Sequence, residues 1–138
     1  MNESSGIHRY ASVVGEDVID HLYQLAEPLR GKRVVHVNST RVGGGVAEIL
    51  DKLVPLMSEL GIEAMWEVIT GEDAFYQCTK RFHNGLQGNS VEIPGRLLEA
   101  YEETNRQNAE TYRAQLEEAD FVVIHDPQPA PLLSLCPG

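Results

Sequence analysis

The sequence lacks several features that would each have indicated a class of protein. Basic residues are scarce, because 11 Lys and Arg stand against 21 Asp and Glu and give a formal net charge of -10. A chain this acidic has no basic stripe to release counterions from nucleic acid, which argues against a nucleic-acid partner. No apolar run approaches the roughly 20 residues that span a bilayer, and the N-terminal segment lacks the basic-then-apolar order of a signal peptide. We therefore expect a cytoplasmic protein without a membrane partner.

Cysteine is also scarce. The two cysteines, Cys78 and Cys136, are far apart in the sequence and belong to no Cys-x-x-Cys or Cys/His ligand spacing. This pattern supports neither a disulfide framework nor a zinc site. We expect buried or incidental thiols.

The hydrophobic pattern alternates between two periods along the 138 residues. Apolar residues at helical spacing predict four helical stretches, and short runs rich in β-branched residues between them predict strands. The predicted helices cover 16–30, 46–60, 75–86 and a long acidic stretch after Pro94, and the predicted strands cover 34–38, 62–69 and 121–124. Strands separated by helices of this length indicate the α/β class, with a parallel sheet in one domain.

A glycine turn follows the first predicted strand. Gly43, Gly44 and Gly45 remove side chains from a strand-to-helix loop, so an anion can approach backbone N–H groups and the positive end of the helix dipole. The turn lacks the Gly-Lys-Ser/Thr of a P-loop, and Glu48 stands where a dinucleotide fingerprint has its third glycine. Glu48 suits the helix dipole but repels a phosphate placed close to it. A plain tight turn remains the alternative.

A second unusual loop follows the last predicted strand. It reads His125-Asp126-Pro127-Gln128-Pro129. A proline moves the residue before it out of the helical region, so we expect extended geometry at Asp126 and Gln128 and a stiff loop with pre-aimed polar side chains. Loops at the carboxyl ends of parallel strands carry ligand sites, although a rigid connector is the alternative.

A third polar group lies on the helical stretch that begins near residue 75. Lys80, His83 and Asn84 fall on one helix face by their i, i+3, i+4 spacing. A solvated helix face is the alternative explanation.

Several other aromatic and imidazole side chains are expected to be structural. We expect Trp66 in the core of an inner strand, His36 in strand packing, His21 on a helix face and His8 at the surface.

Three stretches of sequence together resemble a known family. HVNSTRVGGGVAEIL, FHNGLQGN and HDPQPAPL are similar, in this order, to the N-terminal domain of the trehalose glycosyltransferring synthases of the retaining GT-B superfamily. The resemblance extends from about Tyr10 to the last residue. It implies a Rossmann-like domain with helices on both faces of the sheet, and a second such domain across a cleft. The implied reaction transfers glucose from a nucleoside diphosphate glucose to glucose, with the donor configuration retained, and needs no cofactor or metal.

The resemblance also implies roles for individual residues. It places Gly43, Gly44 and Gly45 against the donor diphosphate, and His125 beside the donor glucose as the catalytic-site histidine. Further polar residues are expected around the sugars, with lower specificity: Asn38, Arg41, Lys80, His83, Asn84, Asp126 and Gln128.

The chain is shorter than this family pattern. We expect residues 1–138 to form the acceptor-side domain, and the nucleotide-sugar domain with its Arg/Lys pair and carboxylate to lie outside these residues. We therefore expect little or no glucose transfer by this chain alone, and apolar surface that favours a homodimer. A trehalose phosphorylase and a non-catalytic sugar- or phosphate-binding module remain alternatives.

Overall fold

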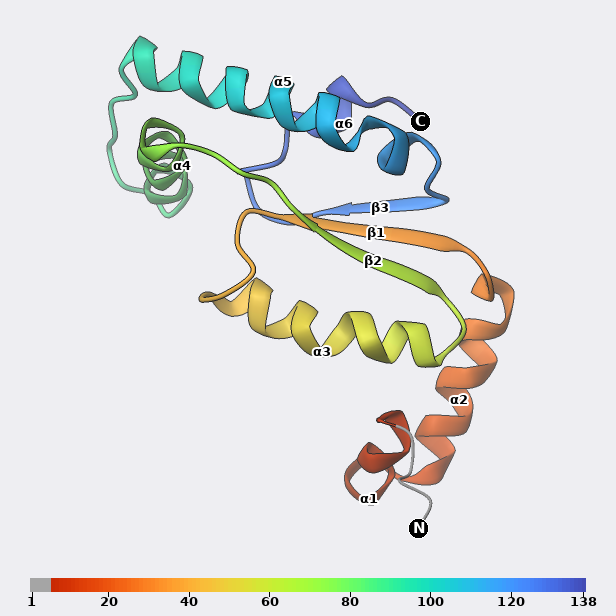
Figure 1. Ribbon diagram of the computed structural model, residues 1–138. Coiled ribbons are helices and arrows are strands. Elements are labelled where there is room, and N and C mark those ends of the chain that lie inside the picture. Colours follow the sequence, from red (N-terminus) through yellow and green to blue (C-terminus); the bar gives the residue numbers. More distant parts are fainter. Residues whose placement is uncertain (1–5) are drawn as a thin grey trace.

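The computed structural model describes residues 6–138 and shows an α/β fold (Figure 1). Within these residues, β1 Arg33–Asn38, β2 Glu63–Val68 and β3 Phe121–Ile124 form one sheet in the order β2-β1-β3. Both pairings are parallel, so the short central strand β1 has a partner on each side. The predicted fold class and all three predicted strands are confirmed, with bounds shifted by a residue at most.

Helices cover both faces of the sheet, as predicted (Figure 1). Helix α3, Gly45–Glu59, connects β1 to β2 on one face. Helices α4, Asp73–Leu86, and α5, Gly95–Glu117, connect β2 to β3, and α5 lies on the opposite face with the short helix α6, Leu132–Leu135. The chain thus leaves β1 toward one edge of the sheet and returns to pair β3 on its other side. This reversal creates a topological switch point between the carboxyl ends of β1 and β3.

Side chains of β1 alternate between the two covered faces. Val35 and Val37 are fully buried and belong to the main core between the sheet and α5. Val34 points the other way and packs with Ala26 and Ile62. His36 shares that face with Val34 because the strand has a period of two. Strand β1 therefore contributes side chains to two hydrophobic clusters, one on each face of the sheet.

Charged residues fasten the amino ends of the strands. The carboxylate of Asp120, just before β3, accepts hydrogen bonds from the backbone N–H of Arg33 at 2.8 Å and from Lys32 Nζ at 3.0 Å. These two contacts, the backbone one first, hold the pKa of Asp120 below its ordinary value. Arg33 also pairs with Glu118 at 3.1 Å. The ion pairs therefore lie at the end of the sheet opposite the two predicted loops.

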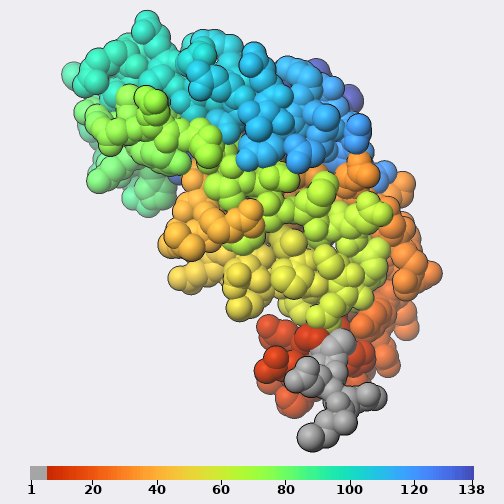
Figure 2. Space-filling view, in the orientation of Figure 1, coloured from red at the N-terminus to blue at the C-terminus, as the bar shows by residue number. Residues whose placement is uncertain are grey.

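The N-terminal helices lie apart from the predicted site. The turn η1 Ile7–Tyr10, the helices α1 Ala11–Val14 and α2 Glu16–Ala26, and the turn η2 Glu27–Leu29 lead into β1. Figure 2 shows η1 and α1, in red, at one end of the molecule, and α4 with the start of α5 at the other. The backbone N–H of Ile7 donates to Glu59 of α3 at 2.8 Å.

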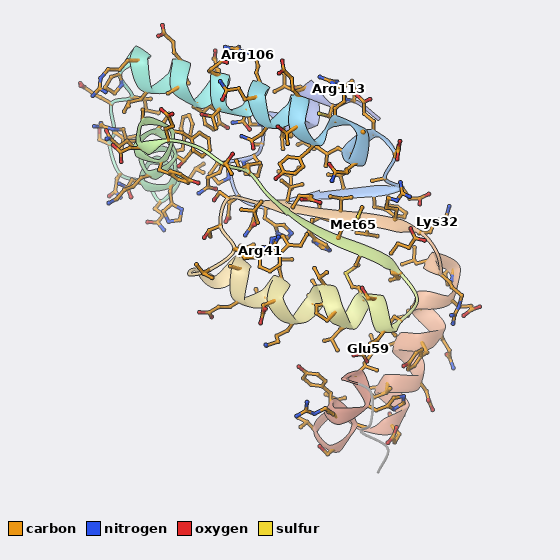
Figure 3. All side chains as sticks on the ribbon, viewed as in Figure 1. Lys32, Arg41, Glu59, Met65, Arg106 and Arg113 are labelled. Carbon is orange, nitrogen blue, oxygen red and sulfur yellow. The ribbon has the colours of Figure 1, made fainter. Side chains whose placement is uncertain are left out.

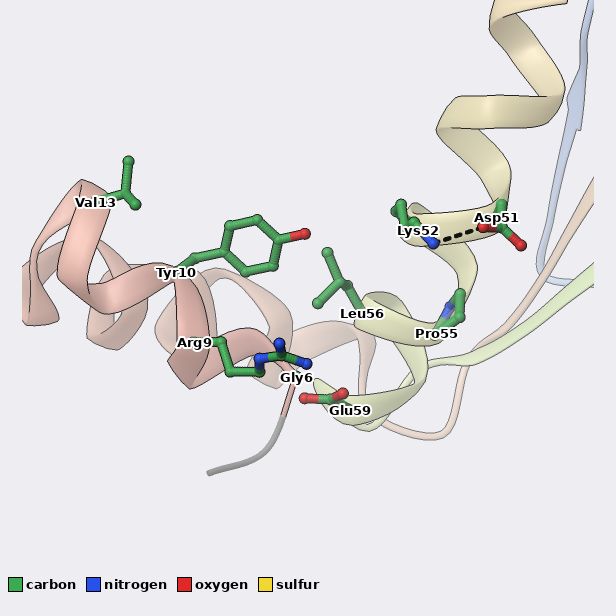
Figure 4. Close-up of a pocket in the computed structure, with 9 residues that line it drawn as sticks. All are labelled: Gly6, Arg9, Tyr10, Val13, Asp51, Lys52, Pro55, Leu56 and Glu59. Carbon is green, nitrogen blue, oxygen red and sulfur yellow. Dashed lines mark hydrogen bonds and ion pairs between the residues drawn. The ribbon is translucent and has the colours of Figure 1, made fainter. Parts of the chain in front are cut away.

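A hollow of about 570 Å³ lies between this N-terminal segment and α3 (Figure 4). The ring of Tyr10 extends toward Leu56 across it, and Lys52 is paired with its neighbour Asp51 at 2.7 Å. None of the predicted site residues lines it. The predicted site residues therefore lie elsewhere on the molecule.

Two further expectations can be compared with the structure. Cys78 and Cys136 are both buried free thiols, as expected from their spacing. In the part of the chain that the structure describes, no helix is both long and apolar enough to cross a membrane.

Apolar residues at helical spacing predict inner faces that include Ile49 and Leu50, Leu86, and Leu97 and Leu98, and these predictions are only partly right. Leu50 and Leu97 are fully buried, but Ile49 is 61% exposed, Leu98 is 40% exposed and Leu86 is 77% exposed. Only one stripe of each helix is covered, because α3 packs with one side on the narrow three-stranded sheet and α4 packs against α5.

Helix α3 offers a direct test of this face assignment. We expect Leu50→Ala to lower the free energy of unfolding by about 2 to 5 kcal/mol, because it leaves a cavity under a fully buried side chain. Ile49→Ala, one position earlier, should change it by about 0.5 kcal/mol or less. Urea denaturation of the three proteins measures both effects, and equal costs at the two positions would contradict the packing of α3.

Candidate functional site

The two predicted loops leave neighbouring strands at the same edge of the sheet. The glycine loop follows β1, the His125 loop follows β3, and β1 pairs directly with β3. The backbone N–H of His125 donates to Val37 O at 2.9 Å, which continues the ladder past the end of β3. His36 Nδ1 lies 3.0 Å from His125 Nε2. The loops therefore converge at the switch point of the sheet, where α/β proteins bind ligands.

The glycine loop presents unobstructed backbone at the start of α3. Gly43 and Gly44 have φ angles of 75° and 84°, in a region of backbone conformation that residues other than glycine rarely adopt. No side chain caps the N-terminus of α3, and a Cβ placed on Gly43, Gly44 or Gly45 would have no heavy atom within 4 Å. The first N–H groups of the helix have no intrahelical partner, so this surface is open to an anion.

The side chain of Asn38, at the end of β1, fixes the start of the glycine loop by hydrogen bonds. Its side chain is 2% exposed; Nδ2 donates to Thr40 O at 2.7 Å, and Oδ1 accepts from Trp66 Nε1 at 2.8 Å. A buried amide with both ends bonded fixes the path of the chain that leaves β1. The predicted sugar-binding residue Asn38 thus has a structural function in the loop, whatever else it contacts.

Arg41 lies over the ring of Trp66. The guanidinium carbon is 4.2 Å from the ring centroid, and Nη2 donates to Trp66 O at 3.1 Å. Figure 3 shows Arg41 between the sheet and the first turn of α3. The expectation that Trp66 is a core residue is wrong: β2 is an edge strand, and the half-buried ring supports an exposed cation.

The His125 loop turns by a different route from the one predicted. Asp126 has a φ of 65°, so the expectation of extended geometry at this residue is wrong. The following proline does exclude the right-handed helical region, but the chain satisfies it with a left-handed residue, which aspartate tolerates better than most. Non-glycine residues in this region are concentrated at functional sites. The exposed side chain of Asp126 is thus carried on a tight reversal directly after His125.

Helix α5 anchors the same loop by its main chain. Tyr101 Oη donates to Pro127 O at 2.7 Å, and Asn105 Nδ2 donates to Gln128 O at 3.1 Å. The side-chain oxygen Oε1 of Gln128 is buried and accepts no hydrogen bond from residues 6–138. An acceptor left in this way is open to a donor that these residues do not provide.

Tyr101 is a site residue that the periodicity did not reveal. The pattern predicts it as an inward-facing helix residue, which is correct, but its hydroxyl reaches the predicted loop. The ring packs edge-on against Phe82 of α4, with centroids 4.9 Å apart. Burial, and secondarily the neighbouring Cys78, raises the pKa of Tyr101 to about 12, so the hydroxyl stays a hydrogen-bond donor.

Helix α4 borders the site, and two of its three predicted residues line one hollow. Tyr76 Oη donates to Ser39 O at 3.3 Å and links α4 to the loop after β1. Lys80 and Asn84 line a shallow hollow together with Arg81. His83 lies outside the lining of that hollow, and its Nε2 is 2.9 Å from Gln87 Nε2.

His36 is the second residue that sequence reasoning missed as part of the site. It is 4% exposed on the central strand, and its ring is nearly parallel to that of His125, with an interplanar angle of 20° and centroids 5.3 Å apart. Burial, followed by the nearby His125, lowers the pKa of His36 from its ordinary value. Its position in a strand gave no sign of this pairing, because the partner is 89 positions away.

Comparison with known proteins agrees with this geometry. The profile of the family described as "Trehalose synthase, N-terminal domain" matches residues 36–137, which include both loops. The chain belongs to this family. The family assignment confirms the resemblance drawn from the three sequence stretches.

Individual relatives point the same way. A trehalose synthase from Thermococcus litoralis is 46% identical over 132 residues, 95% of this chain and 32% of that protein. One from Pyrococcus horikoshii is 48% identical over 125 residues, 90% of this chain and 30% of that protein. A trehalose phosphorylase from Grifola frondosa is 32% identical over 84 residues, 59% of this chain and 12% of that protein. The chain spans about a third of the length of the synthases that it matches.

The described residues contain no evident cluster of metal ligands. Within residues 6–138, no group of three or more His, Cys, Asp or Glu side chains is arranged to hold a metal ion.

The lowered pKa of His36 predicts how stability depends on pH. Unfolded His36 takes up a proton near its ordinary pKa of 6.5, whereas the folded side chain resists protonation. The free energy of unfolding should therefore fall as the pH drops below about 6.5, with a contribution of at most about 1.4 kcal/mol per pH unit.

Urea denaturation at a series of pH values measures this slope. His36→Asn should make it shallower, and His21→Asn, at an exposed helix position, serves as the matched control that keeps the wild-type slope. Identical slopes in the wild type and His36→Asn would show that His36 is not a buried neutral histidine.

Proposed function

We propose that this chain is the acceptor-side, N-terminal domain of a retaining glycosyltransferase that makes trehalose from a nucleoside diphosphate glucose and glucose. The observation that carries the proposal is the convergence of the glycine loop and the His125 loop at one switch point. Membership of the trehalose synthase family supports trehalose as the product. The nucleotide-sugar domain would then lie outside residues 1–138 and close the cleft over these loops.

The donor diphosphate is assigned to the glycine loop. Free N–H groups and the positive end of the α3 dipole favour an anion there. Glu48, in the first turn of α3, disfavours a phosphate placed too close, so a cation is needed nearby. Arg41 provides one, because it is exposed at the same loop and forms no ion pair with a carboxylate in residues 6–138.

The sugars are assigned to the remaining residues of the edge. His125 would contact the donor glucose, and Asp126 and Gln128 would bind sugar hydroxyls from the same loop. On α4, Lys80, His83 and Asn84 would contact the acceptor sugar, with Lys80 and Asn84 lining one hollow.

The proposed reaction needs stabilised charge more than it needs a protein base. The bond from the anomeric carbon to the donor phosphate breaks, a bond to the acceptor oxygen forms on the same face, and the acceptor proton passes to the leaving phosphate. Donors preorganised around that phosphate lower the barrier. The dipole of an exposed helix end contributes only about 0.3 to 1 kcal/mol per charge, so the second domain must supply further positive charge. No cofactor or metal is invoked.

A phosphorylase is the second candidate, and a specific observation favours it. The relative from Grifola frondosa is named trehalose phosphorylase and aligns with 59% of this chain. Inorganic phosphate in place of the nucleotide leaving group would use the same bare amides of the glycine loop. The shorter and weaker match ranks this candidate second.

The donor separates the two candidates. We expect a fusion of these residues to the remaining part of the Thermococcus litoralis relative to form trehalose from a nucleoside diphosphate glucose and glucose. The same protein should form none from glucose 1-phosphate and glucose, and the 138-residue chain alone should turn over neither donor. Chromatography of the products measures all of these, and turnover of glucose 1-phosphate alone would favour the phosphorylase.

The glycine loop can be tested on the chain itself by titration with pyrophosphate. We expect amide shifts in the NMR spectrum at Gly44, Gly45 and Val46 as pyrophosphate binds. Gly43→Ala should weaken binding at least about fivefold, roughly 1 kcal/mol, because a Cβ and a strained φ disturb the open amides.

Gly31→Ala is the matched control for this substitution. Gly31 has a φ of 73° and nothing within 4 Å of an added Cβ, like Gly43, but it lies at the amino end of β1. Gly31→Ala should lower the free energy of unfolding by about 1 to 3 kcal/mol, as Gly43→Ala should, but it should bind pyrophosphate as tightly as the wild type. Equal weakening by both variants, or no shifts at the loop in the wild type, would contradict the phosphate assignment.

A further inference from the structure

Three side chains form a continuous line beneath the site. Met57 Sδ on α3 lies 3.4 Å from His36 Nε2, and His36 Nδ1 lies 3.0 Å from His125 Nε2. The line runs from the helix that begins at the glycine loop, through the central strand, to the loop after β3. It joins the two halves of the proposed site by side-chain contacts.

The chemistry of this line permits one arrangement of protons when both rings are neutral. A neutral imidazole carries one N–H donor and one bare nitrogen acceptor, whereas a thioether sulfur can only accept. Contact with Met57 therefore favours the proton of His36 on Nε2, where it points at sulfur. A bare Nε2 would instead set its lone pair against those of the sulfur.

The position of the second proton follows. With its proton on Nε2, His36 has a bare Nδ1, which must accept the hydrogen bond at 3.0 Å. His125 then has to donate that bond from Nε2, so its own proton is fixed there. The remaining nitrogen of His125, Nδ1, is left without a proton.

We propose that His36, itself oriented by Met57, is a positioning residue that holds His125 in the Nε2–H tautomer. His125 Nδ1 is then left as a hydrogen-bond acceptor at the switch point of the sheet. A group that suits this nitrogen is a hydroxyl that donates, as on a sugar. This last consequence rests on the proposed function, whereas the tautomer does not.

The surroundings of His36 oppose a charge on its ring. His36 is 4% exposed, and its cross-strand neighbours are Trp66 on β2 and Val123 on β3, neither of which carries a charge. Met57 closes the ring from α3. Burial and the nearby His125 both lower the pKa of His36, so protonation of this ring is opposed at neutral pH.

The tautomer can be read directly from the 138-residue chain. Long-range proton–nitrogen NMR correlation of histidine-labelled protein at about pH 8, above the ordinary histidine pKa, distinguishes a protonated from a bare ring nitrogen. We expect both His36 and His125 to show a protonated Nε2 and a bare Nδ1. A protonated Nδ1 on His125 in the wild type would overturn the inference.

Four variants locate the cause. His36→Phe removes the acceptor and should convert His125 to a mixture of tautomers, whereas His36→Asn offers an amide oxygen near the position of Nδ1 and should restore the Nε2–H form. Met57→Leu conserves volume, so it should fold even where a ring substitution does not, and it should mix the tautomers of both histidines. His21→Phe, at an exposed helix position, is the control that changes neither. A His125 spectrum unchanged by both His36→Phe and Met57→Leu would overturn the inference.

The fusion enzyme separates this inference from the proposed function. If His125 contacts the donor glucose, His36→Phe should lower kcat at least about tenfold with little change in the KM for glucose, and His36→Asn should recover most of it, since partners that orient a functional histidine act on this scale. Tautomers as expected together with an unchanged kcat would overturn the role of His125 in transfer and leave the tautomer assignment intact.

Discussion

The pairing of β1 with β3 is the constraint on which the site depends. Neither the glycine loop nor the His125 loop makes the candidate site by itself; the two loops come together because β1 and β3 are hydrogen-bonded neighbours that end on the same side of the sheet. β3 has four residues, and most of the chain between it and β2 is α4 and α5. The long helix must therefore be placed accurately for so short a strand to find its partner.

Buried amides provide that accuracy. Asn108 of α5 accepts from Thr70 N at 3.0 Å and donates to Thr70 O at 2.8 Å, which fixes the helix to the end of β2. About one turn earlier in α5, Asn105 is fully buried and donates to Gln128 O. A hydrogen bond specifies position and direction where apolar contacts tolerate sliding, and a buried amide displaced from its partner is costly. These contacts hold the two ends of the site to one rigid helix.

Charge is distributed in keeping with a site for an anion. In residues 6–138, the basic residues at the amino ends of the strands, Lys32 and Arg33, are paired with carboxylates. At the carboxyl edge, Arg41 and Lys80 form no such pair within the same residues. An acidic protein thus keeps unneutralised cations at the edge where a diphosphate is proposed to bind. Asp126, in its left-handed conformation, adds local strain at that edge, as functional loops often do.

Sequence patterns were enough to predict the three strands, the four longer helices, the α/β class, the glycine turn and the family, but not the short helices α1 and α6. These follow from patterns within short segments, because hydrophobic period and glycine content act on neighbouring residues. Only the tertiary structure decided that β1 is central, that Ile49 and Leu98 face solvent, and that Trp66 supports Arg41. It also decided that His36 meets His125, since a contact across 89 positions depends on the order of strands in the sheet, and periodicity along the chain does not specify that order.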